Sequence, residues 1–452
     1  MQEKNQSVFL GRFSYLLTDF CGNLLFCIIG AYLLYFFTDV YGLPVAVTGT
    51  LLLVTRVLDC LDAPIWGSII DHTKSRYGKS RPFFLWLAIP FAVSMWATFT
   101  TPTFLSETGK IVYAVLTYLI AGIVYSGVQT AITSILPNLT TNHKERMVLN
   151  TFRMVGGSLG AFICMTFTLP LVEFLGQGNE QRGFSITVGM FGIVAAILLI
   201  FAFRHLREKN VEQNESVPVK DSIRAIKNNW PWILLVSANF LAWIGFSMRQ
   251  GTVIYFCKYN LEDGSLTAYL NGILTITCLL SFLSMTFIVK YTKKFGAMLL
   301  GIALIILGYI GISMAGTSVA MIIIFWAIGS FGQGLACAMP FGMLADTVDY
   351  GEYKNNVRAP GFLTSIGSAL CIKGGSGLGA FIPAQIMMIF GYVANAEQTS
   401  ESLLGIEVAF IWAPIVVFVL AAVPMFFYRK YEAQESQIIQ ELAKRTQDKA
   451  NA

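Results

Sequence analysis

Three charged residues, Arg56, Asp59 and Asp62, interrupt an apolar stretch that extends from Val45 to Ile70. Residues three apart lie above one another on a helix, so the three side chains form one charged stripe. The stretch is long enough to cross a bilayer, where a charge at mid-depth costs about 3 kcal/mol on insertion scales. Such groups face a wet cavity or one another and mark ion or substrate pathways. The alternative is a buried pair of Arg56 and Asp59 that only holds helices together.

Other ionisable residues also fall inside apolar stretches. Seven such residues set four positive groups against three negative ones: Arg56, Arg153, Arg249 and Lys373 against Asp19, Asp59 and Asp62. It indicates a cavity that is at least balanced in charge and suited to an anionic glycoside, because the guanidinium fork grips a carboxylate with two hydrogen bonds. Arg153 is expected to touch substrate. Arg249 is either a second such contact or a side chain that snorkels from the outer end of its span.

The composition is that of a protein that crosses the membrane many times. Of 452 residues, 55% are hydrophobic and only 13% are charged. We therefore expect an all-α polytopic membrane protein. The cytoplasmic segments contain no phosphate-binding loop, zinc-protease motif or catalytic triad spacing, so neither an enzyme nor ATP-driven transport is expected, and no cofactor. The eight Cys and three His lack the spacing of a disulfide framework or a metal site.

Apolar runs of about 20 residues predict the transmembrane helices. We expect twelve spans, which places both termini on one side of the membrane. The spans lie near 13–37, 45–71, 82–102, 110–136, 147–174, 183–204, 230–257, 266–290, 296–315, 318–345, 359–392 and 402–428.

The distribution of basic residues sets the orientation. Nearly all Lys and Arg outside the spans fall on the same side as the termini, whereas the opposite loops hold only Lys110, Arg182 and Lys258. By the positive-inside rule, both termini are expected in the cytoplasm. The net charge of +5 therefore describes topology, and no nucleic-acid partner is expected.

A polar stretch after the sixth span divides the chain into two halves of six spans. Arg76-Tyr77-Gly78-Lys79 after the second span has a weak echo in Lys293-Lys294-Phe295-Gly296 after the eighth. Two such halves around a midplane site are the plan of a major-facilitator transporter. The expected domains are an N-terminal half, a central cytoplasmic loop, a C-terminal half and a cytoplasmic tail, at 1–204, 205–229, 230–428 and 429–452.

Several strings along nearly the whole chain resemble one family, the glycoside, pentoside and hexuronide cation symporters, which include the melibiose carrier. The most specific is the acidic string that follows the tenth span. The strings are Thr18-Asp19-Phe20-x-Gly22-Asn23, Tyr35-Phe36-Phe37-Thr38-Asp39-Val40, Arg56-x-x-Asp59-x-x-Asp62-Ala63-Pro64, Ser75-Arg76-Tyr77-Gly78-Lys79-x-Arg81-Pro82, Leu149-Asn150-x-x-Arg153, Asp346-Thr347-Val348-Asp349-Tyr350-Gly351-Glu352-Tyr353-Lys354 and Lys373-Gly374-Gly375-Ser376.

The resemblance implies a cation site, for sodium, lithium or a proton, on the second span near a lysine of the eleventh. Asp59 and Lys373 occupy the matching positions. The family often has a second carboxylate where this chain has Ala63, and Asp62 could replace it because residues three apart share a helix face. Ser126 is assigned to the same cation-coupling site. If the cation is sodium, Asp59 and Asp62 are the expected ligands.

The resemblance also implies a sugar site built from the first, fourth and fifth spans. Asn23, Gln129 and Arg153 occupy the matching positions, with amides at two places where the melibiose carrier has carboxylates. Amides can still bridge sugar hydroxyls because they both donate and accept hydrogen bonds. Tyr125 is expected on the same face as Gln129. The remaining predicted substrate contacts are Asp19, Lys373 and Arg249.

Acidic residues at the cytoplasmic end of the tenth span predict a gate. Asp346, Asp349 and Glu352 lie one turn apart and oppose the helix dipole, so they need cationic partners. Arg76 and Arg81, in the loop after the second span, lie on the same side. A cytoplasmic latch between the two sets is one reading, and a solvated charged face is the other, since exposed pairs are worth only about 0–1 kcal/mol.

Together these features predict cation-coupled symport of a glycoside or hexuronide across the cytoplasmic membrane by alternating access. The coupling ion is Na+ or H+. The expected partners are a small sugar, anionic in one reading, and membrane lipids, and the protein is expected to be a monomer. Alternatives are a sodium-dependent lysolipid carrier of the same superfamily, an uncoupled sugar facilitator, and an intramembrane enzyme or sensor.

Overall fold

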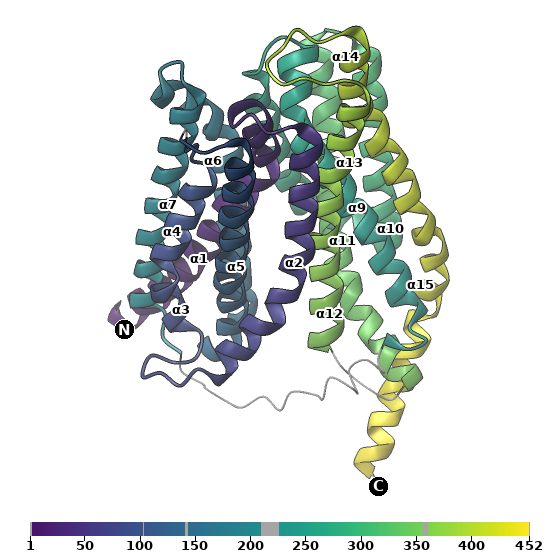
Figure 1. Ribbon diagram of the computed structural model, residues 1–452. Helices are drawn as coiled ribbons and strands as arrows, with labels where there is room; N and C mark the ends of the chain where they lie inside the picture. The colour runs from purple at the N-terminus through teal and green to yellow at the C-terminus, as the bar shows by residue number, and fades with distance from the viewer. Residues whose placement is uncertain (1, 103, 141–142, 209–225, 356–359, 452) are drawn as a thin grey trace. The chain divides into compact units, whose positions relative to one another are not determined.

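The computed structural model describes residues 2–102, 104–140, 143–208, 226–355 and 360–451. Within these ranges all regular structure is helical and no strand is formed, which confirms the all-α class (Figure 1). The first half of the sequence forms α1 (Gln2–Tyr35), the π-helical turn η1 (Phe36–Val40), α2 (Val45–His72), α3 (Arg81–Trp86), α4 (Ala88–Thr98), α5 (Glu107–Leu139), α6 (His143–Gly176) and α7 (Glu180–His205).

The second half contains longer helices and three more π-helical turns. Its elements are α9 (Trp230–Tyr255), η2 (Phe256–Asn260), α10 (Leu266–Ala315), α11 (Val319–Asn355), α12 (Pro360–Ala369), η3 (Leu370–Gly374), α13 (Gly375–Ile389), α14 (Ser400–Glu407), η4 (Val408–Trp412) and α15 (Ala413–Asn451). Lys293 has a non-helical backbone within α10, at the point where the expected eighth and ninth spans meet.

Nine helices in the described part of the chain are long and apolar enough to cross a membrane. They cover nine of the twelve expected spans, including both spans that α10 contains. The other three expected spans coincide with α2, with α3 and α4, and with α12 to α13, which are helical but do not meet the same criterion. A polytopic membrane protein is thus confirmed, whereas the count of twelve spans stays a prediction.

The chain divides into two compact units that differ from the two sequence halves. The first unit comprises Met1–Gln213, Gln250–Thr275 and Ala384–Ile406, and the second comprises Asn214–Arg249, Ile276–Pro383 and Glu407–Ala452. In the first unit α1 packs along α6 and α7, and α2 packs along α5. The unit therefore holds segments of both sequence halves, and the division at 205–229 remains an expectation from the sequence.

The internal echo after the second and eighth spans has a structural counterpart inside each unit. In the first unit Glu208 accepts hydrogen bonds from the backbone N–H groups of Lys79, Ser80 and Arg81, at 3.0, 2.8 and 2.7 Å. In the second unit Glu432 accepts one from the backbone of Lys294 at 2.9 Å. Both carboxylates lie at helix beginnings, where free N–H groups and the positive end of the dipole favour an anion.

Candidate functional site

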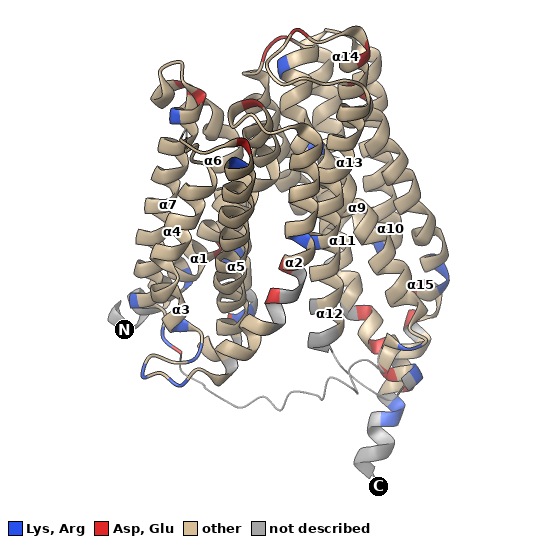
Figure 2. Cartoon of the chain, in the orientation of Figure 1, with Lys and Arg blue, Asp and Glu red and all other residues tan. Residues whose placement is uncertain are grey.

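The charged stripe of α2 lies inside the first unit. Arg56, Asp59 and Asp62 are only 7%, 3% and 9% exposed, and Figure 2 shows basic and acidic residues in the middle part of α2. Arg56 Nη1 lies 3.5 Å from Asp59 Oδ2, so the predicted ion pair is present. The guanidinium also lies 6.0 Å from the ring of Phe26 and 5.8 Å from that of Tyr118. The stripe is thus covered by polar and aromatic groups of the protein.

Helix α5 brings Ser126 and a glycine against this stripe. The Ser126 hydroxyl donates to Asp62 Oδ1 at 2.6 Å. Gly122, one turn earlier on α5, faces Asp59 so closely that a Cβ atom would overlap its carboxylate. The structure brings Asp62 and Ser126 into contact and packs Asp59 against the same helix, whereas the predicted role of the three residues in cation coupling stays a prediction. Two carboxylates and a hydroxyl offer oxygen ligands, which hard cations prefer.

A second polar cluster lies between α1 and α6. Arg153 Nη1 lies 3.4 Å from Asp19 Oδ1, and Arg153 Nε donates to Asn150 Oδ1 at 3.1 Å. Asn23 donates to the backbone oxygen of Asp19 at 3.0 Å. A Cβ atom at Gly157 of α6 would lie 2.5 Å from Asp19 Oδ2 and 2.7 Å from Asn23 Nδ2, so only glycine leaves room for both.

Tyr125 and Gln129 of α5 border both clusters. The Tyr125 ring stacks on Phe26 of α1 at 6.1 Å between centroids. Gln129 approaches α1 at Gly22, where a Cβ atom would lie 3.0 Å from the amide oxygen. Both residues are partly exposed, and their contact with a sugar stays a prediction. The predicted sugar contacts Asp19, Asn23, Tyr125, Gln129 and Arg153 all belong to the first unit.

Arg249, another predicted substrate contact, belongs to the second unit and is 2% exposed, so it does not snorkel. Its Nη2 donates to the Ser330 hydroxyl at 2.8 Å and to the Trp326 carbonyl at 3.1 Å. Its guanidinium lies 3.8 Å from the Trp326 ring centroid and 5.6 Å from that of Tyr309. These contacts tie α9 to α11, and a contact of Arg249 with substrate stays a prediction.

Lys373, which the sequence pairs with Asp59, lies in the π-helical turn η3 of the second unit and is partly exposed. Because Asp59 belongs to the first unit, their meeting stays a prediction. π-Helical turns inside helices often occur at functional sites. That Lys373 lies in one is therefore compatible with a functional role.

The residues predicted to form a cytoplasmic gate have contacts inside their own units. Arg81 donates from Nε to the Phe203 carbonyl at 2.6 Å in the first unit. Arg76 lies against Tyr77 at 4.7 Å from the ring centroid. In the second unit Asp346 pairs with Lys294 at 2.6 Å. Asp349 and Glu352 are partly exposed on the same helix. A gate between the two sets remains a prediction.

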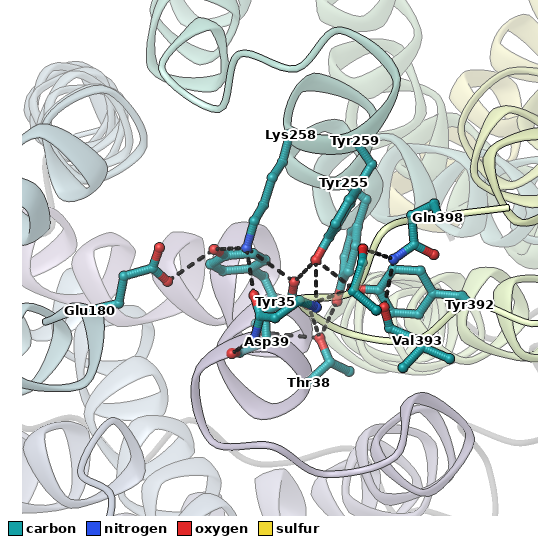
Figure 3. Close-up of polar contacts among 12 residues, drawn as sticks. Tyr35, Thr38, Asp39, Glu180, Tyr255, Lys258, Tyr259, Tyr392, Val393 and Gln398 are labelled. Atoms are coloured by element: carbon teal, nitrogen blue, oxygen red, sulfur yellow. Dashed lines mark hydrogen bonds and ion pairs between the residues drawn. The ribbon is translucent and has the colours of Figure 1, made fainter. Parts of the chain in front are cut away.

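One polar cluster was not predicted from the sequence. It surrounds Asp39 of η1 and includes Lys258 and Tyr259 of η2 and Tyr392, which follows α13 (Figure 3). The string around Asp39 and the basic Lys258 were both noted in the sequence, but no spacing rule relates residues so far apart in the chain. The only signal in the sequence was that an acidic residue, Asp39, and a basic residue, Lys258, are expected on the same side of the membrane.

Comparisons with known proteins identify the family of this chain. The family described as MFS/sugar transport protein matches residues 14–430. The chain belongs to this sugar transport family. It is 39% identical to the isoprimeverose transporter of Lactiplantibacillus pentosus over 99% of this chain and 94% of that protein. It is 29% identical to the glucuronide carrier protein homolog of Escherichia coli, over 95% and 94%.

The fold of this sugar transport family member also resembles a solved transporter. A bacterial homolog of the human lysosomal transporter Spinster, in an inward-facing and unoccupied conformation, superposes with a TM-score of 0.68. The two share 14% identity over 95% of this chain and 98% of that one, so the likeness concerns the fold alone. The protein is therefore a multi-pass membrane transporter of the major facilitator superfamily, not an enzyme.

Proposed function

We propose that this sugar transporter is a cation-coupled symporter that carries a glycoside across the cytoplasmic membrane by alternating access, with both termini in the cytoplasm. The observation that carries the proposal is the double polar cluster of the first unit: Asp59 and Asp62 with Ser126 on one side, and Asp19 with Arg153 on the other. Buried ionisable groups inside apolar helices are costly, and they mark the path of an ion or a substrate.

The charge of the two clusters favours a bound cation. Arg56 and Arg153 are the positive groups, and Asp19, Asp59 and Asp62 are the negative ones. One monovalent cation would balance the single excess carboxylate, so Na+ or H+ is expected to bind before or with the sugar. Asp59, Asp62 and Ser126 are the proposed cation ligands, and Lys373 is proposed to compete with the cation for Asp59. In this arrangement cation binding and lysine pairing exclude each other, which couples the cation to the transport cycle.

The sugar is proposed to bind between α1, α5 and α6. Asp19 and Asn23 offer acceptors and donors for hydroxyl groups, Gln129 does both, and Tyr125 supplies an aromatic face. The Arg153 charge is already met by Asp19 at 3.4 Å, so the cluster does not need an anionic ligand. A glycoside without a charged group is therefore the first candidate, and isoprimeverose is the one that similarity to a named transporter suggests.

A sugar that bears a carboxylate is the second candidate. Arg153 retains donors that could form a fork with a ligand carboxylate, and one relative is named as a glucuronide carrier homolog. Binding of such a ligand would displace Asp19 from Arg153. The two candidates therefore differ in whether the Asp19–Arg153 pair survives in the complex.

Uptake into proteoliposomes tests the proposal. Purified protein would be reconstituted and given isoprimeverose, a glucuronide, a lysolipid or no ligand, each with a sodium gradient, a proton gradient or neither. The proposal expects accumulation of one sugar above the external concentration only when one cation gradient is present. Equal uptake without a gradient would identify an uncoupled facilitator, and preference for the lysolipid would replace the sugar assignment.

A further inference from the structure

The carboxylate of Asp39 is the most completely buried charge at the end of the first span. Its side chain has no exposed area. Oδ2 accepts hydrogen bonds from the Tyr392 hydroxyl at 2.7 Å and from the Thr38 hydroxyl at 2.8 Å. Oδ1 accepts a short hydrogen bond from the Tyr259 hydroxyl and lies 3.2 Å from Lys258 Nζ. We call Thr38, Asp39, Lys258, Tyr259 and Tyr392 the Asp39 cluster (Figure 3).

The donors around Asp39 come from three segments that are distant in the sequence. Thr38 belongs to η1, Lys258 and Tyr259 belong to η2, and Tyr392 follows α13. Asn395 donates to the Asp39 backbone oxygen at 2.5 Å, which fastens the loop after α13 to the same point. All of these residues lie within the first unit. One carboxylate therefore joins the end of the first span to two segments of the C-terminal half of the sequence.

Three further contacts extend the cluster towards α7 and α9. The Tyr35 hydroxyl donates to Glu180 Oε2 at 3.0 Å and accepts from Lys258 Nζ at 2.9 Å. The Thr38 and Tyr255 hydroxyls lie 2.7 Å apart. The Asp39 side chain has no exposed area, whereas the Lys258 side chain is 26% exposed and Glu180 is exposed. Water can thus reach the edge of the cluster but not Asp39.

A cavity of about 760 Å³ borders this edge. Tyr35, Glu180 and Lys258 line it together with residues of α6 and α10. Lys258, which lies 3.2 Å from Asp39, therefore stands between this cavity and the carboxylate. A buried carboxylate that loses its donors must be hydrated, so an intermediate with Asp39 dry and without donors is strongly disfavoured. The closed arrangement is the one observed, and a switching element would need a second one in which Asp39 is hydrated.

We propose that the Asp39 cluster is the outer closure of the transport pathway and that Asp39 is the residue that positions it. The cluster lies at the end of α1 opposite the N-terminus, which the proposed topology places outside the cell. This inference rests on the proposed function, because only a carrier that alternates between two faces needs η1, η2 and the loop after α13 to separate. Asp39 holds them together in one state and becomes hydrated in the other.

The variant Thr38→Cys reports opening of the Asp39 cluster. Thr38 of η1 is fully buried against Tyr255, so a membrane-impermeant thiol reagent should reach a cysteine there only when the cluster opens. Thr38→Cys itself removes one donor to Asp39, so its own rate is the reference for the variant below. Adding Tyr392→Phe removes one donor to Asp39 and should raise the rate about tenfold, the effect of about 1.4 kcal/mol on an equilibrium. Right-side-out and inside-out vesicles would be compared, and the protein without Thr38→Cys would give the background of the native cysteines.

Tyr113→Phe is the matched control, because it also removes one tyrosine hydrogen bond, to the Ala97 carbonyl at 2.9 Å, outside the cluster. It should leave the rate unchanged. Equal rates with Tyr392→Phe and with Tyr113→Phe would overturn the proposal. Reaction that is faster from the cytoplasmic face would overturn the assignment to the outer side.

Hydrogen–deuterium exchange supplies a second readout if Thr38→Cys does not fold. Asp39→Asn should increase exchange in residues 250–260 and 390–398 and leave residues 79–81, which Glu208 holds, unchanged. Uniform change would instead indicate general destabilisation and would contradict a local closure. Both measurements are made without sugar. If the substrate assignment is wrong, the uptake experiment will fail, but the labelling and exchange responses of the Asp39 cluster will remain.

Discussion

Ser126 on α5 donates its hydroxyl to Oδ1 of Asp62 on α2 at 2.6 Å. This contact holds the Asp62 carboxylate towards α5, one helical turn from Asp59. Two carboxylates at this spacing repel each other when both are charged, so a cation that binds between them gains from both. In the proposed cation site the hydroxyl would be a third oxygen ligand, and its hydrogen bond orients Asp62.

Removal of this hydroxyl should weaken cation binding. Ser126→Ala deletes one hydrogen bond to a charged group, which contributes about 1.5–3 kcal/mol. The cation concentration for half-maximal uptake should therefore rise tenfold or more, with little change in sugar affinity at saturating cation. Ser158→Ala, which removes a hydroxyl bonded only to the Met154 carbonyl in α6, is the control. Equal effects of the two variants would assign Ser126 to packing.

Asp62→Asn should weaken cation coupling nearly as much as loss of Asp59, if Asp62 takes the role that Ala63 cannot fill. The exchanged variant, Asp62→Ala with Ala63→Asp, should restore part of the cation dependence. Cation dependence that survives Asp62→Asn unchanged would assign Asp62 to helix packing.

Gly122→Ala should impair coupling through sterics alone. The added methyl group would overlap the Asp59 carboxylate and force it from its position beside Arg56. Cation-driven accumulation should fall at least tenfold. Gly67→Ala of α2 has no atom within 4 Å of the added group and should leave transport intact while slightly favouring the helix. Similar losses in both variants would show that the effect is not specific to Asp59.

Glu208→Ala should lower the thermal stability of the protein without removing a transport group. It leaves three backbone N–H groups at the beginning of α3 without their acceptor, a loss of about 1–2 kcal/mol by analogy with helix caps. Thermal unfolding in detergent should show a lower midpoint. Glu107→Ala, at an exposed carboxylate near the beginning of α5, should have a smaller effect. No difference between the two would contradict a capping role for Glu208.

Arg153→Gln distinguishes the two substrate classes. If the sugar is uncharged, the variant should lower the affinity for it only modestly, because Asp19 loses its partner Arg153. If the sugar carries a carboxylate, the loss should be much larger, since a charge-assisted fork is removed. Competition of each sugar against a labelled glycoside measures the affinity for the charged sugar and for the uncharged one. Equal weakening of a glucuronide and its neutral glycoside would exclude a direct fork from Arg153 to the carboxylate.

The helical fold and the stripe on α2 could be predicted because both follow from local patterns. Apolar runs predict helices, and spacing by three predicts that Arg56 and Asp59 share a face, as their 3.5 Å separation confirms. The expected spans also anticipated the break in α10 at Lys293.

The partners of distant residues could not be derived in this way. Arg153 was assigned to the substrate, and the structure adds that Asp19 already lies 3.4 Å from it. The Asp39 cluster joins residues more than 200 positions apart, so no periodicity relates them. Glu208 likewise binds backbone N–H groups, which every residue except proline has, so the sequence pattern could not predict these contacts.

The most direct test of cation-coupled sugar transport compares two kinds of flux through Asp59→Asn in proteoliposomes. The measurement is uphill accumulation of isoprimeverose driven by a cation gradient, beside downhill exchange of the same sugar without one. The proposal predicts that the variant loses accumulation and retains exchange, whereas the exposed-site control Asp263→Asn retains both. Undiminished accumulation by Asp59→Asn would contradict the assignment of the cation site to α2.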